Sequence, residues 1–216
     1  MKASKRKVAS KPTLPEPRFA ESYLHRAGEV LRKISPTEIE AVTQRLLDAY
    51  HRGAHVFLAG NGGSAALASH FACDLSKTVL GSNCTTAGKR FRVTSLSDAI
   101  PILTAWANDV SYDQIFAQPL RALANEGDLL LCISASGNSP NILEAVRVAK
   151  EMRMNSVALL GFKGGKARDM VDDSILVPVL DYGLSEAAHD VIAHLITTWL
   201  TNAIKGEEAA PLRVVA

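Results

Sequence analysis

Hydrophobic residues recur at helical spacing over the first fifty residues of the chain and then change to short continuous runs. From Glu16 to Ile34 the apolar positions fall on one helical face. A second apolar stripe begins after Ser35-Pro36-Thr37, a sequence that can cap a helix, and ends at Gly53. Both segments are predicted to be amphipathic helices, and a second subunit could cover their apolar faces.

Beyond Gly53, five short apolar runs alternate with segments of helical pattern. The predicted strands are 55–59, 91–96, 128–133, 156–161 and 175–179, and the predicted helices are 64–77, 99–107, 114–124, 141–152 and 185–204. Residues Val79 to Lys89 are predicted to form a flexible loop because they are rich in glycine, serine and asparagine. Strands that are apolar throughout are typical of a parallel sheet covered on both faces, so the fold class is α/β.

Composition fits one domain with a tail at each end. The chain has 216 residues, of which 47% are hydrophobic and 21% charged, enough to bury a full core. The predicted domain spans 18–206, with N-terminal helices at 18–52 and an α/β core at 54–206. Residues 1–17 form a basic tail predicted to be disordered, although contact with RNA or a membrane stays an alternative. Residues 207–216 form a C-terminal tail.

Charge and cysteine content exclude several classes of protein. A formal net charge of +2 is too small to indicate nucleic-acid binding by itself. The sequence has no run of eighteen apolar residues, so no membrane-spanning helix is predicted. Cys73, Cys84 and Cys132 are odd in number and lack metal-site spacing, which favours a reduced, cytoplasmic protein.

Two loops rich in glycine and serine follow directly after predicted strands, at 60–64 and 134–139. Ligands of open parallel sheets bind beyond the carboxyl ends of the strands. Glycine lets the backbone approach an anion, the next helix offers unpaired N–H groups, and serine adds hydroxyl donors. The two loops therefore predict a phosphate site, against the alternative that each is only a tight turn.

Neither loop matches a nucleotide-binding fingerprint. The serine-rich loop contains no lysine, and the chain has no G-x-x-x-x-G-K-[ST] motif, which argues against a nucleoside triphosphatase. The first loop lacks the dinucleotide pattern, and no acidic residue ends the second strand near Leu96.

Gly60-Asn61-Gly62-Gly63-Ser64 followed by His70, and Ser134-Ala135-Ser136-Gly137-Asn138-Ser139, resemble the loops of the sugar isomerase (SIS) domain, and more narrowly those of phosphoheptose isomerases. The resemblance runs from Phe19 to Leu200 and includes Asp98, Ala107-Asn108-Asp109 and Gly164-Gly165. It implies a single three-layer αβα domain with a five-stranded parallel flavodoxin-like sheet. It also implies a homotetramer, with the N-terminal helices in the interface and active sites between subunits.

Aldose–ketose isomerisation moves a proton between C1 and C2 through an enediol, so it needs a base over the carbon and an acid or Lewis acid at the oxygens. His70 and Asp74 are spaced i, i+4 on one predicted helix, and Glu186 and His194 are two turns apart on another. The resemblance makes Asp74 the base and His194 the acid. It also implies a zinc site, whose ligands here would be His70, Asp74, Glu186 and His194.

The resemblance further implies the residues that hold the substrate and its phosphate. Serine hydroxyls would bind phosphate, while Asn61, Asp98 and Asn108 would orient the sugar. The full predicted set is Asn61, Gly62, Gly63, Ser64, Asp98, Asn108, Ser134, Ser136, Gly137, Asn138, Ser139 and Glu186.

The chain departs from the family pattern at four positions. Asp74 stands where the family has glutamate, Ala135 where it has threonine, Gly183 where it has an acidic residue, and Glu186 where it has glutamine. Aspartate is one methylene shorter than glutamate, so the departures put the exact sugar in question more than the fold. The glutamate at 186 should strengthen binding of a dication.

Three functions are consistent with these sequence features. The leading hypothesis is a ketose–aldose isomerase of sedoheptulose 7-phosphate, or of a related sugar phosphate, that feeds heptose-containing surface glycans such as lipopolysaccharide. The second is a non-catalytic SIS protein that senses phosphosugars or binds a replication initiator. Such relatives lack the carboxylate and histidine found here at Asp74 and His194. The third, an SIS lyase, usually has a longer chain.

Overall fold

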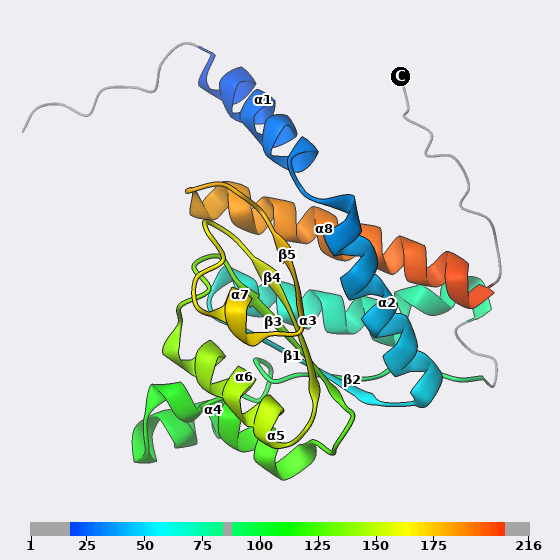
Figure 1. The fold of residues 1–216 in the computed structure, drawn as a ribbon, viewed down its shortest axis with the longest axis vertical. Coiled ribbons are helices and arrows are strands. Elements are labelled where there is room, and N and C mark those ends of the chain that lie inside the picture. Colours follow the sequence, from blue (N-terminus) through cyan, green and yellow to red (C-terminus); the bar gives the residue numbers. More distant parts are fainter. Residues whose placement is uncertain (1–17, 84–87, 206–216) are drawn as a thin grey trace, which may run out of the picture.

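The N-terminal region folds into two helices joined by a short turn. The structure is a computed structural model that describes residues 18–83 and 88–205. Helix α1 (Phe19–Arg32) projects from the body of the molecule, whereas α2 (Pro36–Arg52) lies against it (Figure 1). Helix α2 begins where the Ser35 hydroxyl accepts a hydrogen bond from the amide of Glu38, at 3.3 Å. It ends at Gly53, whose φ of 69° is left-handed.

Five strands form one parallel sheet in the order β2-β1-β3-β4-β5. The strands are β1 (His55–Gly60), β2 (Arg92–Ser95), β3 (Leu129–Ser134), β4 (Asn155–Leu160) and β5 (Asp173–Leu176). This is the flavodoxin-like order, in which the chain changes direction across the sheet between β1 and β3. The predicted α/β class and five-stranded parallel sheet are confirmed.

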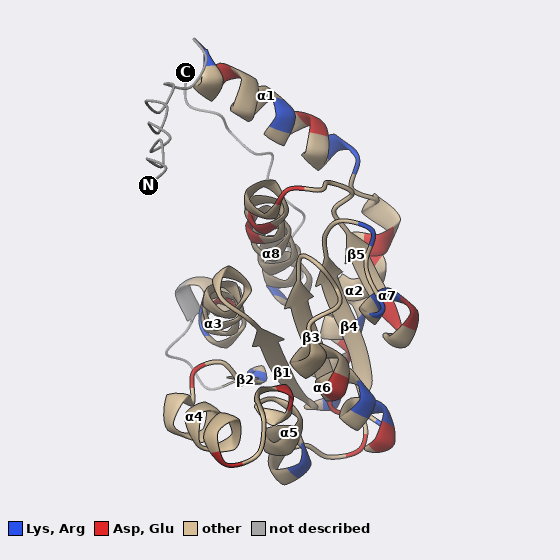
Figure 2. Cartoon of the chain, turned by 90° about the vertical axis from the view of Figure 1, so that its left-hand side faces the viewer, with Lys and Arg blue, Asp and Glu red and all other residues tan. Residues whose placement is uncertain are grey.

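Helices cover both faces of the sheet, as Figures 1 and 2 show. One face carries α2, α3 (Gly63–Ser76) and α8 (Tyr182–Lys205). The other carries α5 (Ala117–Leu123), α6 (Pro140–Glu151) and α7 (Ala167–Met170). Helix α4 (Ile100–Asp109) and the 3₁₀ helix η2 (Tyr112–Gln114) flank the second group.

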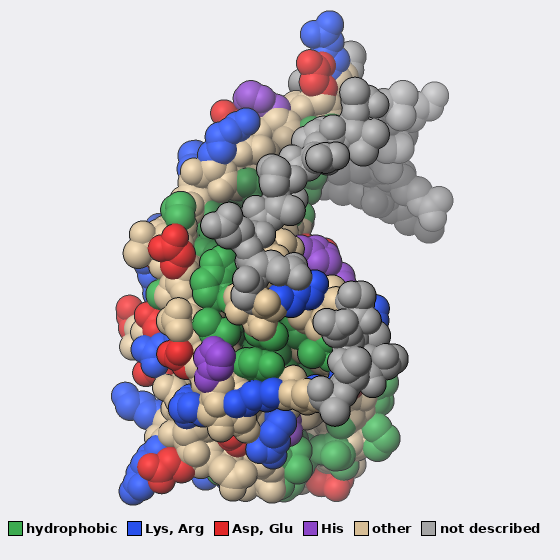
Figure 3. All heavy atoms as spheres, turned by 90° about the vertical axis from the view of Figure 1, so that its right-hand side faces the viewer, with side chains coloured by type: hydrophobic (Ala, Val, Ile, Leu, Met, Phe, Trp, Pro, Cys, Tyr) green, Lys and Arg blue, Asp and Glu red, His purple; other side chains and the backbone are tan. Residues whose placement is uncertain are grey.

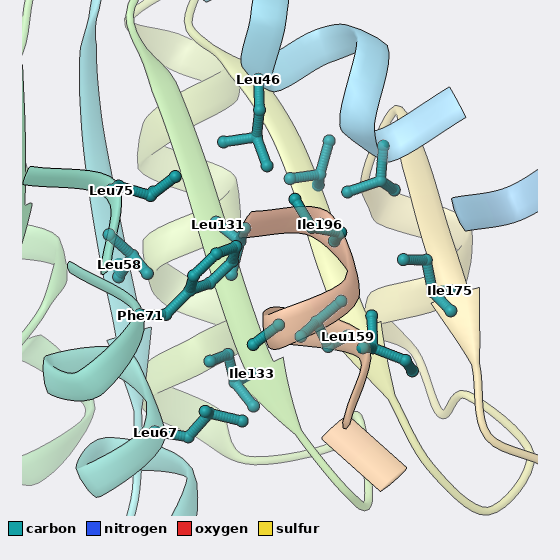
Figure 4. Packing of buried hydrophobic residues seen from close by; sticks show 14 of the residues in the cluster. Leu46, Leu58, Leu67, Phe71, Leu75, Leu131, Ile133, Leu159, Ile175 and Ile196 are labelled. Atoms are coloured by element: carbon teal, nitrogen blue, oxygen red, sulfur yellow. The ribbon is translucent and has the colours of Figure 1, made fainter. Parts of the chain in front are cut away.

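Alternate residues of β1, β3 and β4 supply the two hydrophobic cores. In β3, Leu131 and Ile133 join the core beneath α2, α3 and α8, which Figure 4 shows around Phe71 and Ile196. Their neighbours Leu130 and Cys132 face the core beneath α5 and α6. All four side chains are fully buried, which explains why the strand sequence shows no polar alternation.

The structure corrects two details of the predicted elements. Residues Thr78–Asn83 form η1, two short 3₁₀ helices that meet at a kink at Gly81, and Val79 within it is fully buried, so the predicted flexible loop is wrong there. Strand β5 begins at Asp173, two residues before the predicted start at 175, and ends at Leu176, three residues before the predicted end at 179. The predicted tails, Cys84 and the rest of the 84–87 segment lie outside the described residues. Among the described helices, none is both long and apolar enough to span a membrane.

Candidate active site

The two glycine- and serine-rich loops lie side by side because β1 and β3 are neighbours in the sheet. The loop after β1 leads into α3, and the loop after β3 leads into α6. A reciprocal amide pair joins them: Asn61 donates to Asn141 at 2.9 Å, and Asn141 donates back at 2.8 Å. The Tyr112 hydroxyl also donates to Asn61, at 3.2 Å. Asn61 thus fixes the spacing of the loops with the same amide that was predicted to orient the sugar.

The serine-rich loop is held by its own side chains and by the loop after β4. Ser134 accepts a hydrogen bond from the amide of Gly137 at 3.1 Å, and Ser136 accepts one from the amide of Asn138 at 3.2 Å. At the start of α7, directly after the loop that follows β4, the amide of Ala167 donates to the Gly137 carbonyl at 2.9 Å. The loop is therefore braced in one shape before any ligand arrives.

A cavity of about 110 Å³ opens where the loops meet. Hydroxyls dominate its polar lining, and the N-terminus of α6 begins at Ser139 beside it. No lysine or arginine is among its lining residues, so an anion there would depend on hydroxyls, backbone N–H groups and the helix dipole. The lining comprises Asn61, Ser64, Ile133, Ser134, Ala135, Ser136, Ser139, Tyr182 and Glu186.

A second cavity, of about 390 Å³, adjoins the first through Ser64 and Glu186, which line both. Gly63 and His70 of α3 form one side of it, and Glu186 and Asp190 of α8 form the other. The Glu186 carboxylate lies directly over Gly63, where a β carbon would stand 2.6 Å from Oε2. With two carboxylates and no lysine or arginine among its lining residues, the cavity favours a cation or a neutral sugar.

His70, Asp74 and His194 form a cluster beside this cavity. The Oδ2 atom of Asp74 lies 3.5 Å from Nδ1 of His194 and 3.8 Å from Nε2 of His70. The two imidazoles meet edge to face, with ring centroids 4.9 Å apart. Asp74 is 7% exposed, whereas both histidine side chains are about half exposed, so the carboxylate forms the buried base of the cluster.

The cluster can hold a metal ion. One ligand atom from each of its three residues lies within 4.8 Å of the other two. Tetrahedral ligands about 2.1 Å from zinc stand about 3.4 Å from one another, close to the separations measured around Asp74. Two imidazoles and a carboxylate are donors that zinc accepts. Glu186, the fourth predicted ligand, does not belong to this group of three.

The other predicted site residues are distributed unevenly. Ser64, Ser134, Ser136 and Ser139 share the smaller cavity. Asp98 accepts hydrogen bonds from Ser69 and Ser95 and lines a separate open cleft on the β2 side of α3. Asn108 donates to Asp109 at the end of α4 and lines neither of the two joined cavities. The structure therefore does not bring Asp98 and Asn108 to the cluster.

Several side chains at the site are absent from the predicted set of site residues. Thr78 donates to Oδ1 of Asp74 at 2.8 Å, and Oδ1 of Asp190 lies 3.9 Å from Nδ1 of His70. His189 is fully buried and lines the larger cavity. Asp190 stands four residues from both Glu186 and His194, so helical spacing could have identified it. Thr78 also stands four residues from Asp74, but it lies beyond the end of the predicted helix 64–77, so helical spacing does not indicate it.

Comparison with known proteins defines the class. The family model of the SIS domain matches residues 22–161, so the chain belongs to the SIS domain family. Within that family it belongs with the phosphoheptose isomerases. It is 38% identical to the phosphoheptose isomerase of Mycobacterium tuberculosis (strain ATCC 25177 / H37Ra) over 164 residues, covering 76% of this chain and 81% of the relative. The enzyme of that name from Pelobacter propionicus is 33% identical over 176 residues, covering 82% and 90%.

Solved structures agree with this placement. The phosphoheptose isomerase GmhA from Neisseria gonorrhoeae superposes with a TM-score of 0.76 at 30% identity, covering 85% of this chain and 96% of that chain. The phosphoheptose isomerase from Francisella tularensis gives a TM-score of 0.75 at 27% identity with the same coverage. The sequence-based placement in this family is confirmed, and the chain is an aldose–ketose isomerase of phosphosugars.

Proposed function

We propose that the protein interconverts sedoheptulose 7-phosphate and D-glycero-D-manno-heptose 7-phosphate, in the cytoplasm. The observation that carries the proposal is the Asp74, His70 and His194 cluster beside the cavity that continues into the serine-lined pocket. Phosphate would occupy the smaller cavity, and the reacting end of the sugar would extend into the larger one. The names of the related enzymes support a heptose phosphate as the substrate.

In the proposed reaction, Asp74 takes the proton from one of the two reacting carbons and returns it to the other. A carboxylate fixed from one side can do this without moving far, because C1 and C2 are adjacent. His194, in contact with Asp74, moves a proton at the oxygens as the carbonyl changes place. His70 lines the cavity and holds the sugar oxygens near the pair.

Zinc would be held by His70, Asp74 and His194, with Glu186 as the proposed fourth ligand. When bound, a zinc ion supplies Lewis-acid polarisation of the sugar oxygens. Glu186 lines the phosphate pocket as well as the larger cavity, so a cation would also relieve its repulsion toward phosphate.

We further propose that the chain works as a homotetramer. An apolar groove of about 400 Å³ lies between the α1–α2 region and α8, lined by Leu31, Ile34, Pro36, Ile39, Glu40, Thr43, Val191, Ile192, Leu195 and Trp199. Helix α1 projects from the body with Phe19 and Leu24 exposed (Figures 1 and 2). Such uncovered apolar surface is typical of a subunit interface.

The test is turnover of sedoheptulose 7-phosphate by the native protein, Asp74→Asn and His194→Ala, each before and after chelation. General acid–base groups contribute about 10² to 10⁴ in rate, so each variant should lose at least about a hundredfold in kcat. His51→Ala is the matched control, because His51 is an exposed histidine in the last turn of α2 that lines neither the two joined cavities nor the apolar groove. A decrease after chelation that added zinc reverses would support the metal site.

The competing function is a phosphosugar-binding protein without activity. Native, zinc-supplied protein that binds sedoheptulose 7-phosphate and converts neither it nor other ketose phosphates would contradict the isomerase proposal. Turnover of a different ketose phosphate alone would retain the isomerase and replace the substrate.

A further inference from the structure

Asp74 is the residue on which the geometry of the cluster depends. Among the residues that the structure describes, Asp74 alone pairs with both histidines, and it does so through a single oxygen, Oδ2. The imidazoles are about half exposed, whereas Asp74 is buried. The orientation of the Asp74 carboxylate therefore determines whether one of its oxygens faces the rings of both His70 and His194.

The second oxygen of Asp74 is already engaged. The Thr78 hydroxyl donates to Oδ1 at 2.8 Å, across one turn. Helix α3 ends at Ser76, and Lys77 leaves helical geometry with φ −128° and ψ −50°. The chain then enters η1, whose Val79 is fully buried. This buried anchor fixes the backbone at Thr78 and places its hydroxyl over the last turn of α3.

The two oxygens consequently have different surroundings. An ionised carboxylate only accepts hydrogen bonds, so the Thr78 hydroxyl must act as the donor. Rotating the Asp74 carboxylate so that both oxygens turn toward the histidines would break that hydrogen bond. The contact thus favours the rotamer in which only Oδ2 faces His70 and His194.

We propose that Thr78 is a positioning residue for Asp74: its hydroxyl sets the carboxylate so that one oxygen alone faces the two histidines, where it serves as the base in the metal-free protein or as a ligand when a metal is bound. This inference rests on the proposed function of the cluster. Thr78 belongs to η1, which lines neither of the two joined cavities. In this proposal a residue outside both cavities orients the carboxylate that reacts.

The test compares Thr78→Val, which removes the hydroxyl and keeps the shape, with Thr78→Ser, which keeps the hydroxyl. Thr78 is exposed, so both variants should fold. Thr104→Val is the control, since Thr104 is an exposed threonine that donates to backbone carbonyls of its own helix α4. The affinity for Co²⁺ is measured from its visible absorption during titration, and for Zn²⁺ by competition.

Removing a hydrogen-bond partner of a metal ligand typically lowers the affinity for the metal by about 10- to 100-fold. Thr78→Val should weaken Co²⁺ binding by about that factor and lower kcat with little change in KM. Thr78→Ser and Thr104→Val should stay near the native values. Native affinity in Thr78→Val, or an equal loss in Thr78→Ser, would overturn the proposal.

A crystal structure of Thr78→Val separates this inference from the proposed function. If the native protein neither binds Co²⁺ nor turns over a ketose phosphate, the proposed function fails. The orientation of Asp74 then decides the positioning role. A carboxylate turned away from His194 in Thr78→Val, but not in Thr78→Ser, would support it, and an unmoved carboxylate would refute it.

Discussion

His189 is a buried polar residue at the site that the proposed chemistry does not use. Its side chain is fully buried on α8, and neither ring nitrogen has a hydrogen-bond partner of ordinary geometry. Burial lowers the pKa of the imidazole, and the nearby Leu160 carbonyl offsets only part of this effect. The folded protein therefore holds His189 in its neutral form.

This burial predicts that stability falls in mild acid. Because the pKa of His189 is lower in the folded state, the unfolded chain binds more protons as the pH falls below about 6.5, the ordinary histidine pKa. The stabilisation is complete above that pH and is lost as the pH decreases. His189→Leu should flatten the decrease between about pH 7 and pH 5, which urea unfolding measures.

Two further features sharpen this prediction. Leucine leaves no unpaired polar atom, so at about pH 8 the variant should be as stable as the native protein or more stable. Burial also lowers the pKa of His55, which should retain part of the slope. His25→Leu, at an exposed position, should keep the native slope. An unchanged slope in His189→Leu would contradict the argument.

At the scale of single residues, the sequence predicted contacts within one element better than contacts between elements. His70 and Asp74 are neighbours because they share a helix at i, i+4 spacing. The approach of Asp190 to His70 instead depends on how α8 crosses α3. Asn141 in the first turn of α6 pairs with Asn61 of the loop after β1, a contact that no pattern within either segment reveals.

At the scale of elements, the braced serine-rich loop gives a sharper test. Gly137 has a φ of 61°, and a β carbon there would collide with the backbone carbonyl of Gly164 in the loop after β4. Gly137→Ala should therefore open the serine-rich loop, lower the melting temperature and abolish sugar phosphate binding. Calorimetric titration with sedoheptulose 7-phosphate and thermal unfolding measure these effects.

Gly53→Ala is the matched control for that substitution. Gly53 has a similar φ of 69°, but no other atom lies within 4 Å of a β carbon at that position. Left-handed backbone costs a non-glycine residue about 1–2 kcal/mol, so both variants lose this amount. Only Gly137→Ala should lose more than this and lose the ligand. Equal effects in the two variants would show that the contact with Gly164 is unimportant.

Helices and strands could be predicted from the sequence wherever the spacing of hydrophobic residues and the length of the segment indicated the same kind of element. Strands β1 and β3 are apolar except for His55 at the start of β1 and Ser134 at the end of β3, and they end at glycine- or serine-rich loops, so their positions were clear. Helix η1 was missed because Gly81, Ser82 and Asn83 are typical of loops, while its structure depends on burial of Val79. Helix α7 has four residues, too few for a helical period to appear.

At the scale of the whole molecule, large hydrophobic side chains on the N-terminal helices and on α8 are exposed in the single subunit. Leu195 is 44% exposed and Trp199 is 41% exposed, and both line the groove beside α2. Hydrophobic side chains also reach the surface on the face drawn in Figure 3. Helix α8 carries Glu186 and His194 as well, so an interface on this helix would connect assembly to the site.

This connection predicts that Leu195→Glu lowers both the molecular mass in solution and the activity. The carboxylate would be forced into an apolar interface, at a cost that favours separated subunits. The single subunit should keep its fold, because Leu195 is partly exposed and its neighbour in sequence, Ile196, supplies the buried contact. Light scattering after gel filtration gives the mass, and circular dichroism confirms the fold.

Leu123→Glu is the control, since Leu123 is an exposed leucine at the end of α5, away from the groove. It should leave mass and activity unchanged. If Leu195→Glu dissociates the assembly while each subunit retains full activity, the site is complete within one chain. A native protein that is already a single subunit at micromolar concentration would refute the tetramer itself, and α1 would then need another partner.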